Sequence, residues 1–526
     1  MKRILAVLAA VLFLTAAAGT LLTGCAGGES FVILSGSENE ALEPILDAFG
    51  RQNHVKIEMV YKGSVDIMNL LGTSTIKQYD AVWPANSIWI NMGDRNHIVK
   101  NAQSIMRSPI VFGIRKSLAE ELGFTSGDVY VRDILREIRG GRLRFMMTSA
   151  TQSNSGACAY IGFLNALLDN PDEITLEDLQ DATLQKDVKD LLSGVNRSSG
   201  SSGWLKKLFL AGDYDAMVNY ESMIIEANQE LVAEGREPLY LVYPVDGLAI
   251  ADSPLGMIDK GDERSAAVFQ KLTDYLLGDE AQQELMNLGR RTGFGGSIEG
   301  ADPKVFNPDW GIDSARTLSG IRMPDSDVIM AALELYQSEL KKPAYTIYCL
   351  DFSGSMSGGG ERQLKQAMAL ILTQSQAEQY LLQANRDDVT IVIPFSSYPW
   401  DQLRVDGSDD NELYLLANQI AGLSPLGGTD IYSPAIQALD LLQSVDTDRY
   451  FCAVVLLTDG ESNTGASYRD FAKAYEALDK DIPLFAIMLG NASESQLQPL
   501  ADLTRGSVFE SDGDLVSAFK KVKGYN

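Results

Sequence analysis

Histidine and cysteine are scarce in this sequence of 526 residues. It holds two histidines, His54 and His97, and four cysteines. The histidines stand far apart without metal-ligand spacing, so zinc centres and Ser-His-Asp catalysis have almost no residues to draw on. The cysteines show no disulfide framework. Two of them, Cys349 and Cys452, fall in apolar strand-like runs, where we expect buried thiols; a bridge would require those strands to be neighbours with suitable geometry.

Positive charge is also in short supply. Lys and Arg number 44 against 71 Asp and Glu, which gives a net charge of −27. Such an acidic chain repels nucleic acid and anionic lipid headgroups, so we expect neither as a partner and interpret the charge as solubility. The 45% hydrophobic content is typical of folded globular domains, and the length predicts two or three of them.

A loop at 351–360 reads Asp-Phe-Ser-Gly-Ser-Met-Ser-Gly-Gly-Gly. It follows an apolar run at 345–350 that predicts a buried strand, and it precedes an amphipathic helical pattern. Asp351, Ser353 and Ser355 are therefore expected at the carboxyl end of a strand, where ligands bind in open α/β sheets. Oxygen donors without imidazole or thiolate suit a hard divalent cation, Mg²⁺ first, with Mn²⁺ or Ca²⁺ as alternatives.

Two later stretches carry matching chemistry: Gly-Gly-Thr-Asp at 427–430 and Leu-Thr-Asp-Gly-Glu at 457–461. Together with the first loop they resemble the metal-ion-dependent adhesion site of von Willebrand factor type A domains, which has the form Asp-x-Ser-x-Ser, then a distant Thr, then a distant Asp. The positions that match are Asp351, Ser353, Ser355, Thr429 and Asp459. The alternative is a set of turn residues that only cap helices.

The resemblance implies a doubly wound, Rossmann-like α/β domain over residues 345–526. It also implies that the three hydroxyl side chains hold the cation, directly or through water, while the two aspartates orient them and balance the charge. One coordination position then stays open for a carboxylate of a partner protein. Glu461 is a second candidate for that position, from within the chain.

The N-terminus has the pattern of a secretory signal. Met1-Lys-Arg3 is basic, and an apolar run extends from Ile4 to Leu22. The run ends in Leu-Thr-Gly-Cys25, which resembles a bacterial lipobox. The resemblance implies a signal peptide over 1–24, lipid on Cys25, a short tether over 25–30, and anchoring on the extracytoplasmic face of the cell membrane. An uncleaved membrane helix is the alternative, since the run approaches spanning length.

From residue 31 onward strands, Ser/Gly turns and helices alternate, which predicts parallel βαβ units. Apolar strand patterns occupy 31–34, 55–61 and 79–84, and hydroxyls stand where the next helices begin. The order resembles that of type II periplasmic solute-binding proteins, particularly the molybdate- and sulfate-binding branch, over residues 31–322. The resemblance implies a fold of two lobes with a ligand cleft between them.

By position in this resemblance, five residues face the cleft: Ser37, Ser64, Ser155, Gly156 and Tyr220. Ordinary helix capping is the alternative for each of them. The ligand class stays open at this point. Two acidic side chains near the first turn, at 38 and 40, fit an amine or cation better than a free oxyanion, and the glutamate at 221 adds a negative charge beside the tyrosine. The tryptophans at 83 and 89 either stack on an organic ligand or pack in the core.

Three segments are predicted as connections. The Ser/Gly-rich stretch 197–203 is expected to be a flexible surface loop. Residues 297–325 are rich in Gly, Pro and Asp and predict the interdomain connection. A connecting helix is expected within 323–344, ended by Pro343, because the residue before a proline avoids helical geometry.

These patterns predict a non-enzymatic, lipid-anchored protein that binds a protein partner through a divalent metal, with the solute-binding-like domain as a sensor or second binding surface. The alternative is the substrate-binding receptor of an ABC-type transporter, with the C-terminal domain as an accessory. Catalysis is not expected, because no general base or nucleophile stands beside the predicted metal ligands.

Overall fold

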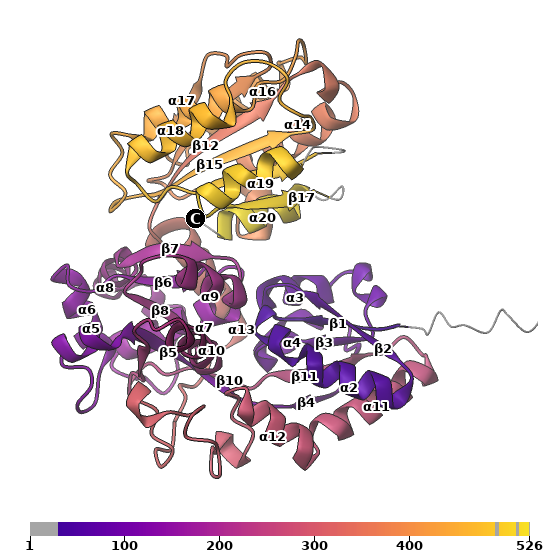
Figure 1. The fold of residues 1–526 in the computed structure, drawn as a ribbon, viewed down its shortest axis with the longest axis vertical. Coiled ribbons are helices and arrows are strands. Elements are labelled where there is room, and N and C mark those ends of the chain that lie inside the picture. The colour runs from indigo at the N-terminus through magenta and orange to yellow at the C-terminus, as the bar shows by residue number, and fades with distance from the viewer. Residues whose placement is uncertain (1–29, 490–493, 512–514, 525–526) are drawn as a thin grey trace, which may run out of the picture.

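The computed structural model describes residues 30–524, apart from 490–493 and 512–514 (Figure 1). The predicted signal peptide (1–24), the lipidation site Cys25 and the tether up to residue 29 lie outside the described residues. In the part of the chain that is described, no helix has both the length and the apolar character needed to cross a membrane. The fold consists of two α/β lobes and a third α/β domain.

The first lobe is built on a five-stranded sheet in the order β2-β1-β3-β11-β4. β1 pairs in parallel with β2 and β3, whereas β11 runs antiparallel to β3 and β4. The strands are β1 (Ser30–Ser35), β2 (Lys56–Tyr61), β3 (Ala81–Trp83), β4 (Val99–Ser104) and β11 (Pro254–Ile258). The main helices are α2 (Glu43–Asn53), α3 (Ser64–Leu71), α4 (Ser87–Gly93), α11 (Glu263–Leu276) and α12 (Asp279–Asn287). A short 3-10 helix, η1 (Ser37–Leu42), follows β1 directly.

The second lobe has a six-stranded sheet in the order β10-β5-β8-β6-β7, with β9 also paired to β5. Its strands are β5 (Ser108–Arg115), β6 (Phe145–Thr148), β7 (Val195–Ser199), β8 (Ala216–Tyr220), β9 (Leu239–Val242) and β10 (Ile250–Ala251). Its helices are α5 (Lys116–Glu121), α6 (Val131–Arg139), α7 (Asn154–Leu167), α8 (Ala182–Ser193), α9 (Ser202–Ala211) and α10 (Glu221–Ala233). Every residue of α7 is buried, so this helix passes through the centre of the lobe.

The prediction of a flexible loop at 197–203 is wrong. Residues 197–199 form the end of β7 and are buried, and α9 begins at Ser202. Ser201 caps that helix by accepting a hydrogen bond from the Trp204 amide. Small hydroxyl residues serve here as a buried strand end and a helix cap, two roles that composition does not separate from a linker.

Two of the connections between the lobes run directly from strand to strand. The chain passes from β4 into β5 and returns from β10 into β11, so each lobe contains segments that are distant in sequence. The segment after α12 extends along the second lobe with two short 3-10 turns, and Trp310 and Ile312 within it are buried against that lobe's core.

The third domain has a six-stranded sheet in the order β14-β13-β12-β15-β16-β17, parallel throughout except at the β14 edge. Its strands are β12 (Ala344–Asp351), β13 (Val389–Phe395), β14 (Leu403–Asp406), β15 (Phe451–Thr458), β16 (Leu484–Met488) and β17 (Ser507–Glu510). Separate apolar clusters cover the two faces, which explains the continuous apolar runs of the central strands. The longer helices are α14 (Gly359–Leu372), α16 (Asp410–Ala421), α17 (Tyr432–Leu442), α18 (Tyr468–Leu478), α19 (Glu494–Leu503) and α20 (Leu515–Gly524).

Cys349 and Cys452 lie on the neighbouring strands β12 and β15, both as free thiols. Their register separates them, because Cys349 stands opposite Leu456 and Cys452 opposite Tyr345. Burial raises the pKa of the Cys452 thiol to about 12. Both side chains are therefore core residues, and no disulfide joins them.

The third domain packs on the two-lobed part through α13 (Ser326–Leu335) and through direct polar contacts. The Tyr214 hydroxyl of the second lobe donates to Asp481 at 2.6 Å. The last helix, α20, reaches both lobes. Its Lys520 ammonium lies 3.2 Å from Asp66 of α3, and its carbonyls accept hydrogen bonds from the second-lobe side chains of Gln152 and Ser198.

Candidate metal centre and interlobe cleft

The predicted metal loop lies where β12 ends. Asp351 is the last residue of β12, a 3-10 turn covers Gly354–Met356, and α14 begins at Gly359. β12 is flanked by β13 and β15 in parallel, with Asp351 opposite Phe395 and Leu350 opposite Leu457. The loops after all three strands therefore meet at one edge of the sheet.

Hydrogen bonds join four of the five predicted residues, Asp351, Ser353, Ser355 and Asp459, in one cluster. One carboxylate oxygen of Asp351 accepts from the Ser353 amide at 2.7 Å, and the other accepts from the Thr458 hydroxyl at 2.6 Å. The Ser355 hydroxyl lies 3.0 Å from that of Ser353 and donates to Asp459 at 2.8 Å. These hydroxyls and carboxylates thus point to a common space.

Thr429, the fifth residue, reaches the same space from the loop before α17. The backbone fixes that loop, because the Gly354 amide donates to the Gly427 carbonyl at 3.0 Å. A Cβ placed on Gly460 would lie 3.4 Å from the Ser355 hydroxyl oxygen and 3.6 Å from that of Thr429. The two hydroxyls therefore face the same glycine.

Three supporting residues were not identified from the sequence as parts of the site. Thr458 binds Asp351, Ser397 accepts from the Gly428 amide at 2.7 Å, and Asn463 accepts from the Thr429 amide at 3.1 Å. Thr458 stands directly before Asp459, so its position in the sequence could have identified it as part of the site. Ser397 and Asn463 become neighbours of the Thr429 loop only through the tertiary fold.

The cluster contains two carboxylates, and among the residues described no Lys or Arg side chain pairs with them. Burial, opposed by hydrogen bonds, raises the pKa of Asp351, and the nearby charge of Asp459 raises it further. Burial also raises the pKa of Asp459. No group of three or more His, Cys, Asp or Glu side chains with metal-binding geometry occurs in the described ranges, so a cation here would depend on the hydroxyls. Two carboxylates and three hydroxyls are a donor set that fits a hard cation.

The five predicted cleft residues divide into two groups. Ser37 and Tyr220 lie at the contact between the lobes: the Ser37 hydroxyl accepts from the Gly203 amide at 3.1 Å, and the Tyr220 hydroxyl accepts from Asn154 at 2.9 Å. Ser64, Ser155 and Gly156 are buried within their own lobes.

The buried group has packing roles. Ser64 accepts from the Ala85 amide at 3.1 Å, and Ser155 lies 2.8 Å from the hydroxyls of both Thr148 and Ser202. A Cβ on Gly156 would lie 2.2 Å from the Thr148 carbonyl oxygen, so this glycine permits close packing of α7 on β6. The structure therefore supports the capping and packing alternative at these three positions.

The lobes touch along the cleft. The Val65 amide of α3 donates to the Gln152 carbonyl at 3.3 Å, and the Trp89 indole donates to Asn154 at 2.7 Å. Trp89 is buried and serves as a core residue with one polar contact. An ion pair at 3.1 Å joins Lys207 of the second lobe to Glu40 of the first.

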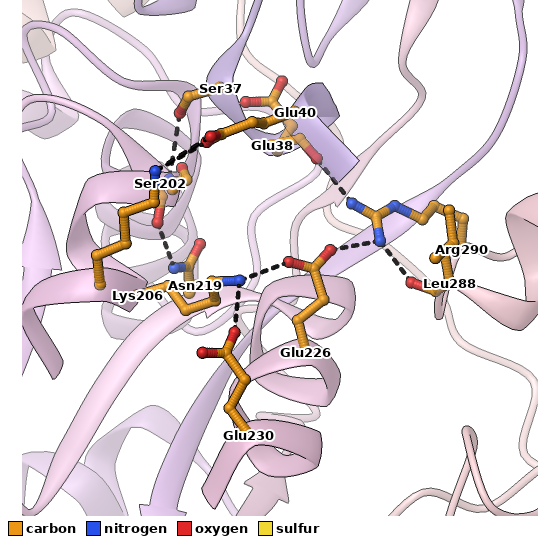
Figure 2. A network of polar contacts seen from close by, with 12 residues as sticks. Ser37, Glu38, Glu40, Ser202, Lys206, Asn219, Glu226, Glu230, Leu288 and Arg290 are labelled. Carbon is orange, nitrogen blue, oxygen red and sulfur yellow. Dashed lines mark hydrogen bonds and ion pairs between the residues drawn. The ribbon is translucent and has the colours of Figure 1, made fainter. Parts of the chain in front are cut away.

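Two further arginines between the lobes, Arg290 and Arg291, each have a carboxylate partner. Figure 2 shows Arg290 between Glu226 and the backbone of Glu38, with guanidinium contacts of 2.5 Å and 2.7 Å. Arg291 binds Glu221 at 2.6 Å, and Tyr243 donates to the same carboxylate. Glu221 is thus neutralised inside the fold and does not present its charge to a ligand.

Between the lobes lies a cavity of about 20 Å³, large enough for a group of the size of one water molecule. It is lined by Glu38, Ala85, Met106, Arg107, Ser108, Tyr220, Ser222, Ala251, Ser253 and Arg290. Of the predicted cleft residues only Tyr220 lines it. The serines come from the two interlobe connections and the start of α10, which the sequence analysis did not consider.

Comparison with known families gives two matches. Residues 31–291 match the model of bacterial extracellular solute-binding proteins, and residues 347–517 match that of the von Willebrand factor type A domain. No curated protein matches the chain. The chain therefore combines a solute-binding-like domain with a von Willebrand factor type A domain, and the predicted fold class is confirmed.

Similar solved structures include the sulfate-binding protein SubI from Mycobacterium tuberculosis, at 14% identity, 57% of this chain, 96% of that chain and TM-score 0.40. The periplasmic binding protein AfuA from Actinobacillus pleuropneumoniae is similar at 13% identity, with coverage of 58% and 93% and TM-score 0.42. A von Willebrand factor type A protein from Catenulispora acidiphila is 17% identical, covers 35% of this chain with 42% of its own length, and has TM-score 0.29.

The buried carboxylate of Glu38 should make the stability of the protein depend on pH. Its Oε1 is buried without a hydrogen-bond partner, and burial raises its pKa to about 7 from the usual 4.5. The folded protein therefore holds this proton more tightly than the unfolded chain, so stability is full below about pH 4.5 and falls as pH rises through about 7. We expect Glu38→Gln to be more stable than wild type at about pH 8, by on the order of 2 kcal/mol, and equal to it in acid.

Thermal unfolding across this pH range measures the difference. Glu40→Gln is the matched control, because Glu40 is exposed on the same turn and paired with Lys207. A stability difference for Glu38→Gln that does not change with pH would contradict the prediction.

Proposed function

We propose that this chain is a membrane-anchored, extracytoplasmic binding protein. Its von Willebrand factor type A domain binds a protein partner through a divalent cation, and its solute-binding-like domain acts as a sensor or second binding surface. The role is binding and not catalysis. The observation that carries the proposal is the convergence of Asp351, Ser353, Ser355, Thr429 and Asp459 at one edge of the sheet.

Mg²⁺, with Mn²⁺ or Ca²⁺ as alternatives, would supply an electrophilic centre with a free coordination position. The hydroxyls of Ser353, Ser355 and Thr429 would hold it, and the carboxylates of Asp351 and Asp459 would balance its charge. Thr458 keeps the Asp351 carboxylate in place. Because the donors that hold the cation would be mainly neutral hydroxyls, the cation would stay electrophilic, so an external carboxylate is the natural additional donor. Glu461 is exposed beside the site and is the internal alternative.

The surface around the cluster also supports a protein partner. Leu426 and Tyr398 lie on the loops that frame the site, and they are 51% and 61% exposed. The Leu426 amide binds the Phe352 carbonyl at 2.8 Å, which holds this exposed side chain close to the metal loop. Apolar and aromatic side chains next to a charged centre are typical of interface cores.

Substitutions that remove one hydroxyl group at a time test metal binding. We expect Ser355→Ala and Thr429→Ala to weaken Mg²⁺ or Mn²⁺ binding by about 10- to 100-fold, because each removes one oxygen donor. Isothermal titration of the purified chain measures this, and the melting temperature shows whether the domain stays folded. Ser357→Ala is the matched control, since Ser357 is exposed on the same loop outside the motif. Equal metal affinity in all three variants would refute the site.

Partner binding should depend on the same residues. We expect a protein captured from the extracytoplasmic face by wild type and by Ser357→Ala to be released by EDTA and to be absent from Thr429→Ala captures. Replacing one exposed Asp or Glu of that partner should then abolish binding, because it provides the missing donor. Binding that resists both chelation and Thr429→Ala would contradict a metal-bridged contact.

Anchoring through Cys25 is part of the proposal, and the lipobox-like Leu-Thr-Gly-Cys sequence supports it. Two acyl chains give stable membrane attachment, which one chain alone does not. In a bacterial host that processes lipoproteins, we expect Cys25→Ser to block lipid attachment and cleavage before residue 25. The mass of the N-terminal peptide measures both. An unmodified Cys25 in an uncleaved wild-type chain would instead favour a membrane helix.

A further inference from the structure

Glu38 is a carboxylate without an ion-pair partner at the centre of the interlobe contact. Three of the cations around it are already engaged, Arg290 with Glu226, Arg291 with Glu221, and Lys207 with Glu40. A fourth, Arg107, is exposed and also lines the cavity, and it makes no ion pair among the residues described. Within the described part of the chain, Glu38 makes no ion pair, although its carboxylate lies between the lobes. Its carboxylate is thus buried in the cleft without an ion pair of its own.

Two hydrogen-bond acceptors on the same turn are also without donors. Glu38 Oε1 and Asn39 Oδ1 are both buried and unpartnered. The amide of Asn39 is oriented, because its nitrogen donates to the Ser35 hydroxyl at 3.0 Å, so its oxygen faces away from that bond. Buried acceptors without donors are costly, and native structures contain few of them.

The cavity beside Glu38 provides room and further polar atoms. Tyr220, Ser108, Ser222 and Ser253 line it together with Glu38, and its volume of about 20 Å³ suits a group as small as a water molecule or an ammonium. Tyr220 lies close enough to Glu38 that the glutamate charge, after burial, contributes to raising the tyrosine pKa. Most of these side chains present oxygens, which accept N–H donors.

We propose that the cleft binds a small molecule through a primary ammonium group held by Glu38. This rests on the proposed function of the two-lobed domain as a ligand-binding unit. A primary ammonium supplies both a positive charge for the Glu38 carboxylate and the N–H donor that its buried oxygen lacks. A quaternary ammonium has charge but no donor, and an oxyanion is repelled by the carboxylate.

A ligand larger than the cavity requires the lobes to separate. The contacts that must open are the Ser37–Gly203 hydrogen bond and the Glu40–Lys207 ion pair, both at the cleft edge. One buried donor in the cleft, Arg290 Nε, is also unpartnered and is the group an oxyanion would use. Because the charge of that guanidinium is already matched by Glu226, an inorganic oxyanion serves as the competing probe in the test.

The test is calorimetric titration of the full mature chain in EDTA, so that the metal site plays no part. Ethanolamine is the primary-ammonium probe, choline the quaternary one, and sulfate the oxyanion. We expect saturable binding of ethanolamine alone, at least about tenfold weaker in Glu38→Gln. Binding should stay within about twofold of wild type in Glu43→Gln, whose glutamate is exposed at the start of α2 and accepts from Tyr61 within the first lobe. Circular dichroism checks that Glu38→Gln keeps the wild-type fold at pH 8, where its melting temperature is expected to exceed that of wild type.

Three results would overturn the proposal: no saturable binding of ethanolamine to wild type, equal binding by Glu38→Gln, or saturable sulfate binding that Glu38→Gln retains. Each of these leaves metal-dependent partner binding untouched, because that is measured separately with Ser355→Ala and Ser357→Ala. Loss of metal binding in Ser355→Ala, conversely, does not alter the amine titration in EDTA.

Discussion

The parallel pairing of β12 between β13 and β15 is the constraint on which the candidate metal centre depends. Parallel strands end at the same edge of a sheet, so the pairing of the strands is enough to bring the loops after residues 351, 395 and 458 together. Burial of Asp351 at the strand end then removes its carboxylate from water, and the neighbouring hydroxyls must satisfy it. Among the residues described, the same geometry brings no Lys or Arg side chain to these oxygens.

The two-lobed part shows the opposite treatment of charge. Between the lobes the cations of Arg291, Arg290 and Lys207 meet the carboxylates of Glu221, Glu226 and Glu40. Buried pairs, such as the two that involve arginine, contribute little net stability, but removing one partner leaves a costly isolated charge. The two arginine ion pairs therefore determine which surfaces of the lobes face each other. Glu38 is conspicuous against this background because it has no such partner.

The last helix connects these regions physically. α20 packs its apolar side into the third domain's core through Ala518, Phe519 and Val522. Its polar side touches Asp66 of the first lobe and Gln152 of the second. Gln152 is also the residue whose carbonyl receives the Val65 amide across the cleft. A change in lobe spacing must therefore alter the contacts of a helix that belongs to the third domain.

The sequence by itself determined the architecture and identified the candidate metal residues. Apolar runs alternating with helical periods identified both α/β parts, because burial of parallel strands on two faces requires continuous apolar sequence. The metal loop was readable because its residues follow strands directly, so local position almost sets their direction.

Only the tertiary structure decided which hydroxyls serve the cleft, and it decided that the stretch at 197–203 is buried and ordered into a strand end and a helix cap. Ser37, Ser64 and Ser155 all stand at helix starts, and a hydroxyl there either caps, packs or faces a ligand according to how the neighbouring lobe lies. The neutralisation of Glu221 by Arg291, 70 residues away, likewise depends on a contact that no local pattern encodes.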